Sequence, residues 1–255
     1  SYYNMTTGQP TGVFVMNGVV GTSAESAGYF AIMKDGTAKI GVKGDYASDK
    51  DNIQEAVGIY TMLIQDGKIC AGLDAKTKYV RQTIGITADG KVITMTADGS
   101  QAPVSIGLTV QEQAEVMLDL GCVWAGHLDG GGSGTYGSKP EGSDKFVITN
   151  KPSDGSERSI SNGLIIVSTA TTSYEFDHIA FNASNEYMTP GTSVDVSVVG
   201  VSSTGNSSEI PENLTYEVVN GTYADGVFTA GNTVGDATIT AMYNGKSVGT
   251  YSLNV

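Results

Sequence analysis

The chain is poor in basic residues and in long apolar runs, and each shortage excludes a class of protein. Its 255 residues carry 14 Lys and Arg against 27 Asp and Glu, so the formal net charge is −13 at pH 7. Nucleic acids and anionic membranes are bound through basic patches, so neither is expected as a partner. No apolar run approaches the roughly 18 residues that a membrane span needs, and no signal peptide is visible.

Cysteine is scarce as well, with Cys70 and Cys122 alone in the sequence. Two cysteines are too few for a disulfide framework, and they lack the CxxC spacing of zinc sites. One disulfide bridge and two buried thiols both stay open. No spacing in the chain demands a metal and no cofactor is predicted, although acidic loops can bind Ca²⁺.

Glycine and β-forming residues are abundant instead. The chain has 34 Gly, and only 16% of its residues are charged. Asp-Gly pairs within 34–37, 65–68 and 88–91 stand between β-rich runs. Because Asp-Gly readily supplies the positive φ angles of a tight turn, these pairs predict hairpins.

One helix is predicted, over 109–121. Thr109 and Glu112 have the spacing of a capping box, and Gly121 stands where a C-terminal cap belongs. Its apolar stripe consists of Val110, Ala114, Met117 and Leu118. An apolar strand follows over 122–129.

The composition and the strand pattern of the sequence change near residue 170. Beyond it, short strands recur about every ten residues, separated by turns such as Asn244-Gly245, and Lys246 is the single basic residue. We therefore predict an α+β fold in two domains. Residues 1–170 form a mixed or antiparallel sheet domain with few helices, and residues 174–255 form an all-β, immunoglobulin-like sandwich.

The most unusual stretch is HLDGGGSGTYGS, at 127–138. It contains a GxGxxG pattern, but Pro140 and Gly142 follow where a dinucleotide-binding unit would open a helix. It also lacks the Lys of a Walker loop and misses the GxSxG of a hydrolase elbow. Two interpretations stay open. Either the bare backbone contacts a ligand, with Ser133 and Thr135 adding hydroxyl donors, or the loop is tight for packing alone.

Four blocks along the first two thirds of the chain occur in an order typical of one family. GLTVQEQAEVMLDLGCVWAGHLDGGGSGTY (107–136) combines a Gly-Leu-Thr helix, an apolar strand and Leu-Asp-Gly-Gly-Gly-Ser. The others are SYYNMTTGQPTGVFVMNG (1–18), YVRQTIGITADGKVI (79–93) and NKPSDGSERSISNGLIIVS (150–168). Together they resemble the phosphodiester glycosidase family. In 79–93 the chain departs from the family's Arg-Thr pair, because Gln82 intervenes.

The resemblance implies hydrolysis of the sugar–phosphate bond of glycosyl-1-phosphodiesters, such as those of N-acetylglucosamine. In the family an Asn precedes the Ser1-Tyr2-Tyr3 motif, and it would lie before Ser1. The tail resembles bacterial immunoglobulin-like repeats, most closely over 226–245. Both resemblances imply a bacterial protein that is secreted or held at the cell surface. Its expected partners are a carbohydrate or sugar-phosphate substrate and the cell wall or an exopolysaccharide.

Cleavage of such a bond needs a carboxylate near the anomeric carbon, and N–H or cationic groups around the phosphate. The resemblance therefore points to Asp129 as the leading catalytic carboxylate, nucleophile or base, with Asp154 as its partner and His127 as an acid or base. The predicted substrate-binding residues are Arg81, Gly130, Gly131, Gly132, Ser133, Thr135 and Arg158, with the two arginines clamping the phosphate.

Each charged side chain also has a structural interpretation. Asp154 is typical of an Asx-turn, and Arg158 can pair with Glu157 or another surface acid. Arg81 can brace a strand edge, and a lone His127 on a strand is often structural. For the whole protein, the alternative is a non-catalytic glycan-binding protein of the cell wall or an exopolysaccharide. An enzyme for another phosphodiester linkage is a further alternative.

Overall fold

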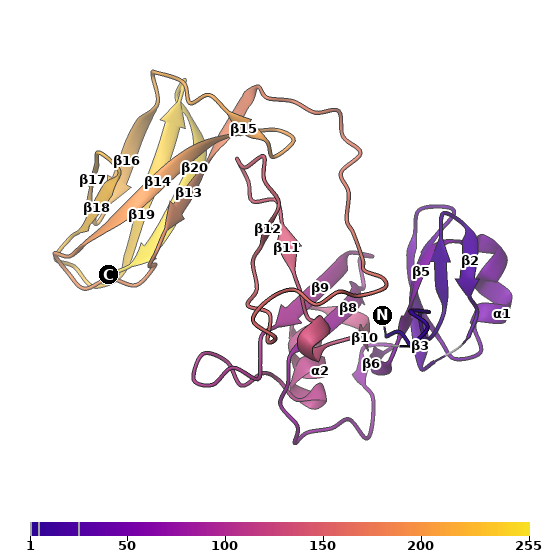
Figure 1. Ribbon diagram of the computed structural model, residues 1–255. Helices are drawn as coiled ribbons and strands as arrows, with labels where there is room; N and C mark the ends of the chain where they lie inside the picture. Colours follow the sequence, from indigo (N-terminus) through magenta and orange to yellow (C-terminus); the bar gives the residue numbers. More distant parts are fainter. Residues whose placement is uncertain (1, 5, 25) are drawn as a thin grey trace. The chain divides into compact units, whose positions relative to one another are not determined.

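The computed structural model describes residues 2–4, 6–24 and 26–255, so Ser1 of the predicted N-terminal motif lies outside the described residues. The chain divides into two compact units (Figure 1). The first contains the residues up to Gly137 together with Ile148–Ile166, and the second contains Ser138–Val147 and Val167–Val255. The short strands β11 (Gly137–Ser138) and β12 (Val147–Ile148) pair where the chain passes from one unit to the other.

The first unit contains two five-stranded sheets with antiparallel neighbours. The first sheet has the order β2 (Val19–Thr22), β1 (Phe14–Met16), β5 (Ile53–Ile59), β3 (Gly28–Met33) and β4 (Ala38–Val42). A short helix α1 (Tyr46–Asp49) and a 3₁₀ turn η1 (Lys50–Asn52) connect β4 to β5.

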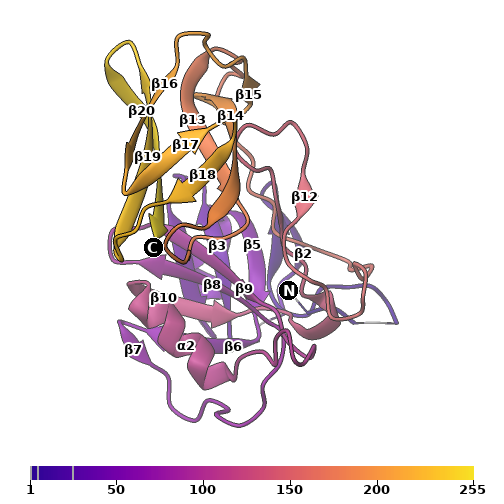
Figure 2. The ribbon, with the colours of Figure 1, turned by 90° about the vertical axis from the view of Figure 1, so that its left-hand side faces the viewer.

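The second sheet carries the predicted helix and the predicted site. Its order is β7 (Lys68–Ile69), β6 (Thr61–Gln65), β10 (Cys122–His127), β8 (Arg81–Thr87) and β9 (Val92–Ala97). The helix α2 (Val110–Asp119) lies against this sheet (Figure 2). The central strand, β10, leads directly into the glycine loop.

Hydrophobic cores hold these layers together. Between the two sheets pack Phe30, Ile40, Val57, Ile59, Met62, Ile84, Ile86 and Leu128, with Trp124 at the margin. Between the second sheet and α2 pack Leu63, Ile64, Val110, Ala114, Met117, Cys122 and Ala125. The end of β10 is thus fixed from both faces, which makes it a rigid support for a site.

The local sequence signals were accurate. All three Asp-Gly pairs form the predicted turns, between β3 and β4, β6 and β7, and β8 and β9. In α2 both bonds of the capping box form between Thr109 and Glu112. Gly121 has φ +85° just beyond the helix.

Three details differ from expectation or close an open alternative. Leu118 of the predicted apolar stripe is 36% exposed, whereas the polar Gln113 is fully buried at 0%. The strand predicted over 122–129 ends at His127. Cys70 and Cys122 are both free thiols.

The second unit is built of two antiparallel sheets that share one core. One sheet contains β13 (Phe176–Ala183), β14 (Ser193–Ser202), β18 (Val227–Ala230) and β17 (Gly221–Ala224), with β15 (Ser207–Ser208) beside β14. The other contains β16 (Thr215–Val219), β19 (Asp236–Tyr243) and β20 (Lys246–Asn254). The core includes Val196, Phe228, Ala237, Ile239 and Leu253.

The chain is therefore rich in sheet with few helices, as predicted. The immunoglobulin-like identity of the second unit stays a prediction. In the described part of the chain, no helix has both the length and the apolar character needed to cross a bilayer.

Candidate functional site

The centre of the predicted site lies where the central strand of the second sheet ends. His127, the last residue of β10, lies opposite Thr61 of β6 and Thr83 of β8. Asp129 follows two residues later, and the glycine loop 130–134 comes next. Because β6, β8 and β10 end or begin at this edge, side chains distant in the sequence meet here.

The His127 side chain is held in a polar environment and is only 3% exposed. Its Nδ1 lies 3.2 Å from the amide nitrogen of Gln113 on α2, and its Nε2 lies 3.3 Å from the Tyr2 hydroxyl. Burial and, next, the charge of Arg81 lower the pKa of His127 from 6.5 to about 4, against an opposing effect of the Gln82 carbonyl. The imidazole is therefore neutral at neutral pH.

Two tyrosines lie beside His127. The ring centroids of Tyr2 and Tyr60 are 4.2 Å apart, and both rings meet the imidazole edge-on at 6.4 and 6.3 Å. Tyr60 is 58% exposed, so this aromatic pair is open to solvent. Exposed aromatic faces are a common surface for the apolar side of a sugar ring.

The Asp129 carboxylate lies near these rings. Burial, followed by the charge of Asp129 and then by Tyr60, raises the pKa of Tyr2 to about 12. Asp129 itself is half-buried. Across residues 2–4, 6–24 and 26–255, no side chain or backbone group is hydrogen-bonded or ion-paired with its carboxylate. With no partner in this described part of the chain, the half-buried carboxylate is available to a substrate.

Arg81 opens β8 and is anchored rather than mobile. Its Nε donates to the Leu108 carbonyl at 2.9 Å, and its Nη2 donates to the Thr77 carbonyl at 2.8 Å. The residue is 9% exposed. These two bonds brace the start of the strand, and among the described residues Nη1 has no hydrogen-bond partner.

The glycines of the loop are explained first by protein packing. A side chain at Gly130 would strike the Val80 carbonyl oxygen, one at Gly131 the ring of Tyr79, and one at Gly134 the Val80 side chain. Gly131 also has φ +59°, a conformation that favours glycine. The loop is thus pressed against the segment that leads into β8.

Gly132 faces a different neighbour, an ion pair. Arg158 donates from Nε and Nη2 to one Asp154 oxygen, at 2.8 and 2.7 Å. A Cβ atom at Gly132 would collide with both side chains. The two are 40% and 42% exposed. Asp154 is therefore engaged with Arg158, and the acid that Arg158 pairs with is Asp154 rather than Glu157.

The backbone of the loop is largely committed to internal hydrogen bonds. The N–H groups of Gly131, Ser133 and Gly134 donate to backbone carbonyls. Ser133 is also buried, at 7%. The carbonyl of Thr135 accepts from the Gln82 side chain at 3.0 Å. An anion at this loop would have fewer amide donors than a glycine nest offers.

A second polar network secures the loop from the other end. The Asn150 amide donates to the Gly134 carbonyl and to Asp98, both at 3.0 Å, and its oxygen accepts from the Tyr136 N–H. Asp98 also accepts from the Lys151 N–H. The start of the block 150–168, together with Asp98, thus holds the glycine loop in place.

Sequence reasoning missed three residues that stand in this site, namely Gln113, Tyr60 and Tyr2 as a side chain in contact with His127. A signal existed for Gln113, because it falls on the apolar stripe of an amphipathic helix, where a polar residue needs a partner. Nothing local marks Tyr60, which lies in the short connection between β5 and β6. Only the folded chain shows its role.

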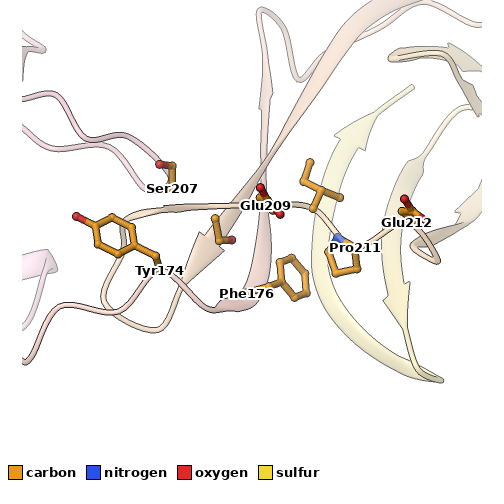
Figure 3. A pocket seen from close by; sticks show the side chains of 8 residues that line it. Tyr174, Phe176, Ser207, Glu209, Pro211 and Glu212 are labelled. Atoms are coloured by element: carbon orange, nitrogen blue, oxygen red, sulfur yellow. The ribbon is translucent and has the colours of Figure 1, made fainter.

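Two further observations concern possible ligand sites elsewhere in the chain. A hollow of about 820 Å³ lies on the second unit, and none of its lining residues belongs to the predicted site (Figure 3). It is lined by Tyr174, Phe176, Ser207, Ser208, Glu209, Ile210, Pro211 and Glu212. No group of three or more His, Cys, Asp or Glu side chains that could hold a metal is found among the described residues.

Comparisons with known proteins agree with the resemblance. Residues 1–167 match the family described as phosphodiester glycosidase. The SPbeta prophage-derived uncharacterized protein YomE of Bacillus subtilis (strain 168) is 32% identical over 187 residues. That alignment covers 67% of this chain but 26% of the relative, so the chain spans about a quarter of the relative's length.

Two solved structures are more distant. The catalytic domain of zebrafish N-acetylglucosamine-1-phosphodiester alpha-N-acetylglucosaminidase, auto-inhibited by its pro-peptide, is 21% identical, covering 60% of this chain and 54% of that chain with a TM-score of 0.48. A hypothetical protein from Synechocystis is 14% identical, covering 43% and 29%, with a TM-score of 0.30. The match over residues 1–167 spans more than half of the sequence. The chain belongs to the phosphodiester glycosidase family.

Proposed function

We propose that this chain is a hydrolase that cleaves the bond between a sugar and phosphate in glycosyl-1-phosphodiesters. The observation that carries the proposal is the Asp129 carboxylate. It lies half-buried just beyond the end of β10 with no hydrogen-bond or ion-pair partner among the described residues, and both it and the anchored Arg81 lie within electrostatic range of Tyr2. A carboxylate in such a position can approach an anomeric carbon as nucleophile or base.

The arginines suit the phosphate half of the substrate. A phosphate monoester is a good leaving group, so bond cleavage needs cationic stabilisation more than proton donation. Arg158, which is exposed and adjacent to Gly132, can grip two phosphate oxygens by exchanging its partner Asp154 for the substrate. Arg81 keeps Nη1 for the same purpose.

The sugar half suits the tyrosines. Tyr60 is exposed and packs against Tyr2 with the two rings tilted by 33°, and the charge of Asp129 lies within electrostatic range of Tyr2. A sugar ring over these faces would present its anomeric carbon towards the carboxylate. N-acetylglucosamine is the first sugar to test, because it is the sugar of the family's best-known activity. Secretion, and a second unit that spaces or anchors the enzyme at a cell surface, belong to the same proposal.

The test is release of free sugar from a panel of sugar-1-phosphodiesters by the chain and by its Asp129→Asn variant. The variant keeps the size of the side chain and removes its charge. Turnover should fall about 10²–10⁴-fold, while substrate affinity changes little. Asp119→Asn, at the exposed end of α2, is the matched control and should turn over normally.

Two results would contradict the proposal. If Asp129→Asn keeps its turnover, Asp129 is not the catalytic carboxylate. If the folded chain binds sugars or sugar phosphates but releases none across the panel, the protein is a glycan-binding member of the family rather than an enzyme.

A further inference from the structure

The buried Gln113 is the unusual feature of α2. Gln113 is 0% exposed, and its amide nitrogen lies close to three groups of the second sheet. These are the Gln82 carbonyl at 3.0 Å, the Thr83 hydroxyl and His127 Nδ1 at 3.2 Å. A completely buried amide that reaches a site residue needs an explanation beyond packing.

The orientation of this amide follows from the Gln82 carbonyl. A carbonyl oxygen only accepts, so the group of Gln113 that faces it must be the NH₂ and not the oxygen. The opposite orientation would set two acceptors against each other. The orientation leaves Gln113 Oε1 buried without a hydrogen-bond partner among the described residues, which is unfavourable. The site keeps the donor at His127 in spite of that cost.

The same comparison of donors and acceptors indicates which nitrogen of the His127 ring carries the proton. The Gln113 NH₂ faces Nδ1 as well as the Gln82 carbonyl and the Thr83 hydroxyl. A protonated Nδ1 would set one N–H against another, so this arrangement favours an unprotonated Nδ1. The Gln82 carbonyl also interacts with the imidazole, but it already accepts from Gln113 and from the Leu128 N–H at 2.9 Å, which occupies both of its lone pairs. The proton therefore sits on Nε2, where the Tyr2 hydroxyl oxygen can accept it.

We propose that Gln113 is a positioning residue that holds His127 as the neutral Nε2–H tautomer, so that His127 serves the reaction as a hydrogen-bond donor and not as a base. The donor is directed at Tyr2, on the side of the site where Asp129 lies. This inference rests on the proposed function for the meaning of the reaction, but the tautomer itself is a property of the folded protein.

The charges around His127 agree with this role. Arg81 lies within electrostatic range of the imidazole and opposes a second proton, and burial acts in the same direction. Tyr2 and Tyr60 approach it with their rings edge-on. Among the described residues, the polar groups that face it are the Gln113 amide, the Gln82 carbonyl and the Tyr2 hydroxyl. A neutral donor can stabilise a developing negative charge without adding a cation to the site.

The direct test is ¹⁵N NMR of the two histidines, since His127 and His178 are the only ones in the chain. At pH 7, His127 should show a protonated Nε2 and an unprotonated Nδ1. A His178→Gln variant assigns the signals. A protonated Nδ1 on His127 would overturn the proposal.

Variants of Gln113 then test the positioning role. Gln113→Glu replaces the donor by an acceptor, so the His127 proton should move to Nδ1, and turnover should fall about 10²-fold. Gln113→Met keeps the volume without a hydrogen bond and should give a mixture of tautomers. Gln111→Met on the same helix, whose side chain contacts Glu115 rather than the site, is the control and should change neither.

The outcomes separate this inference from the proposed function. An Nε2–H tautomer in a protein that releases no sugar would leave the placement of His127 intact and refute the glycosidase. Normal turnover with His127 protonated on Nδ1, or unchanged turnover in a folded Gln113→Glu variant with a shifted proton, would refute the role of Gln113.

Discussion

The two sides of the candidate site differ in how their polar groups are held. On the strand side, Arg81 and His127 are 9% and 3% exposed and are bonded to backbone or buried side chains. On the loop side, Asp154 and Arg158 form an i,i+4 ion pair that is about 40% exposed. An exposed pair is worth little in stability, whereas the buried groups are costly to disturb.

The glycine loop runs between these sides and shows the same difference. Gly130 faces the backbone of Val80, which cannot yield, while Gly132 faces the ends of the Arg158 and Asp154 side chains, which can. The strand side is therefore rigid, whereas the side chains on the loop side can adjust. A rigid carboxylate side and a movable phosphate clamp would suit a substrate with two chemically different halves.

The largest expected effect is that of Gly130→Ala on stability. The new methyl group would press on the Val80 carbonyl, and relief requires the start of β8 to shift, at a cost of about 3 kcal/mol. Urea unfolding followed by the fluorescence of Trp124, the only tryptophan, reports on the first unit. Gly163→Ala, where nothing lies near the added atom, is the control. Equal stability of both variants would contradict the interpretation that the strand side is rigid.

A smaller effect is expected from pH acting on His127. The pKa of His127 is about 4 in the folded chain and 6.5 in the unfolded chain. Between pH 4 and pH 6.5 the unfolded chain therefore binds a proton at this histidine that the folded chain does not bind. Stability should therefore fall as pH falls through this window, by about 2 kcal/mol between pH 7 and pH 5. The change should be absent from His127→Gln and present in His178→Gln. An identical pH dependence in His127→Gln would contradict the burial of a neutral imidazole.

The smallest expected change in stability is that of Gly132→Ala. The added methyl group displaces Arg158 and Asp154, whose exposed pairing contributes less than about 1 kcal/mol. The effect should appear in KM instead, raised about 5-fold for phosphodiester substrates if Arg158 grips the phosphate. Arg158→Gln should raise KM similarly, and the double variant should add little. If the Gly132→Ala protein were as unstable as the Gly130→Ala protein, the two sides of the site would not differ in rigidity.

Some of the site could be predicted because its signals are local. The capping box of α2 and the Asp-Gly hairpins depend on residues a few positions apart, and the structure has them as expected. The glycine loop was located because its composition is extreme. That the glycines make room for Val80, Tyr79 and Arg158 could not be predicted, since those neighbours are distant in sequence.

The sequence by itself determined the sheet-rich character of the chain, the place of α2, the position of the glycine loop after β10 and the family. These follow from periodicity, turn chemistry and a run of motifs, which need no knowledge of long-range contacts. Only the tertiary structure decided that Gln113 reaches His127, that Tyr2 and Tyr60 pack together beside it, and that Asp154 pairs with Arg158. The physical reason is that a hydrogen bond or a ring contact forms between whatever groups the packed sheets and helix bring together, and no local pattern records that partner.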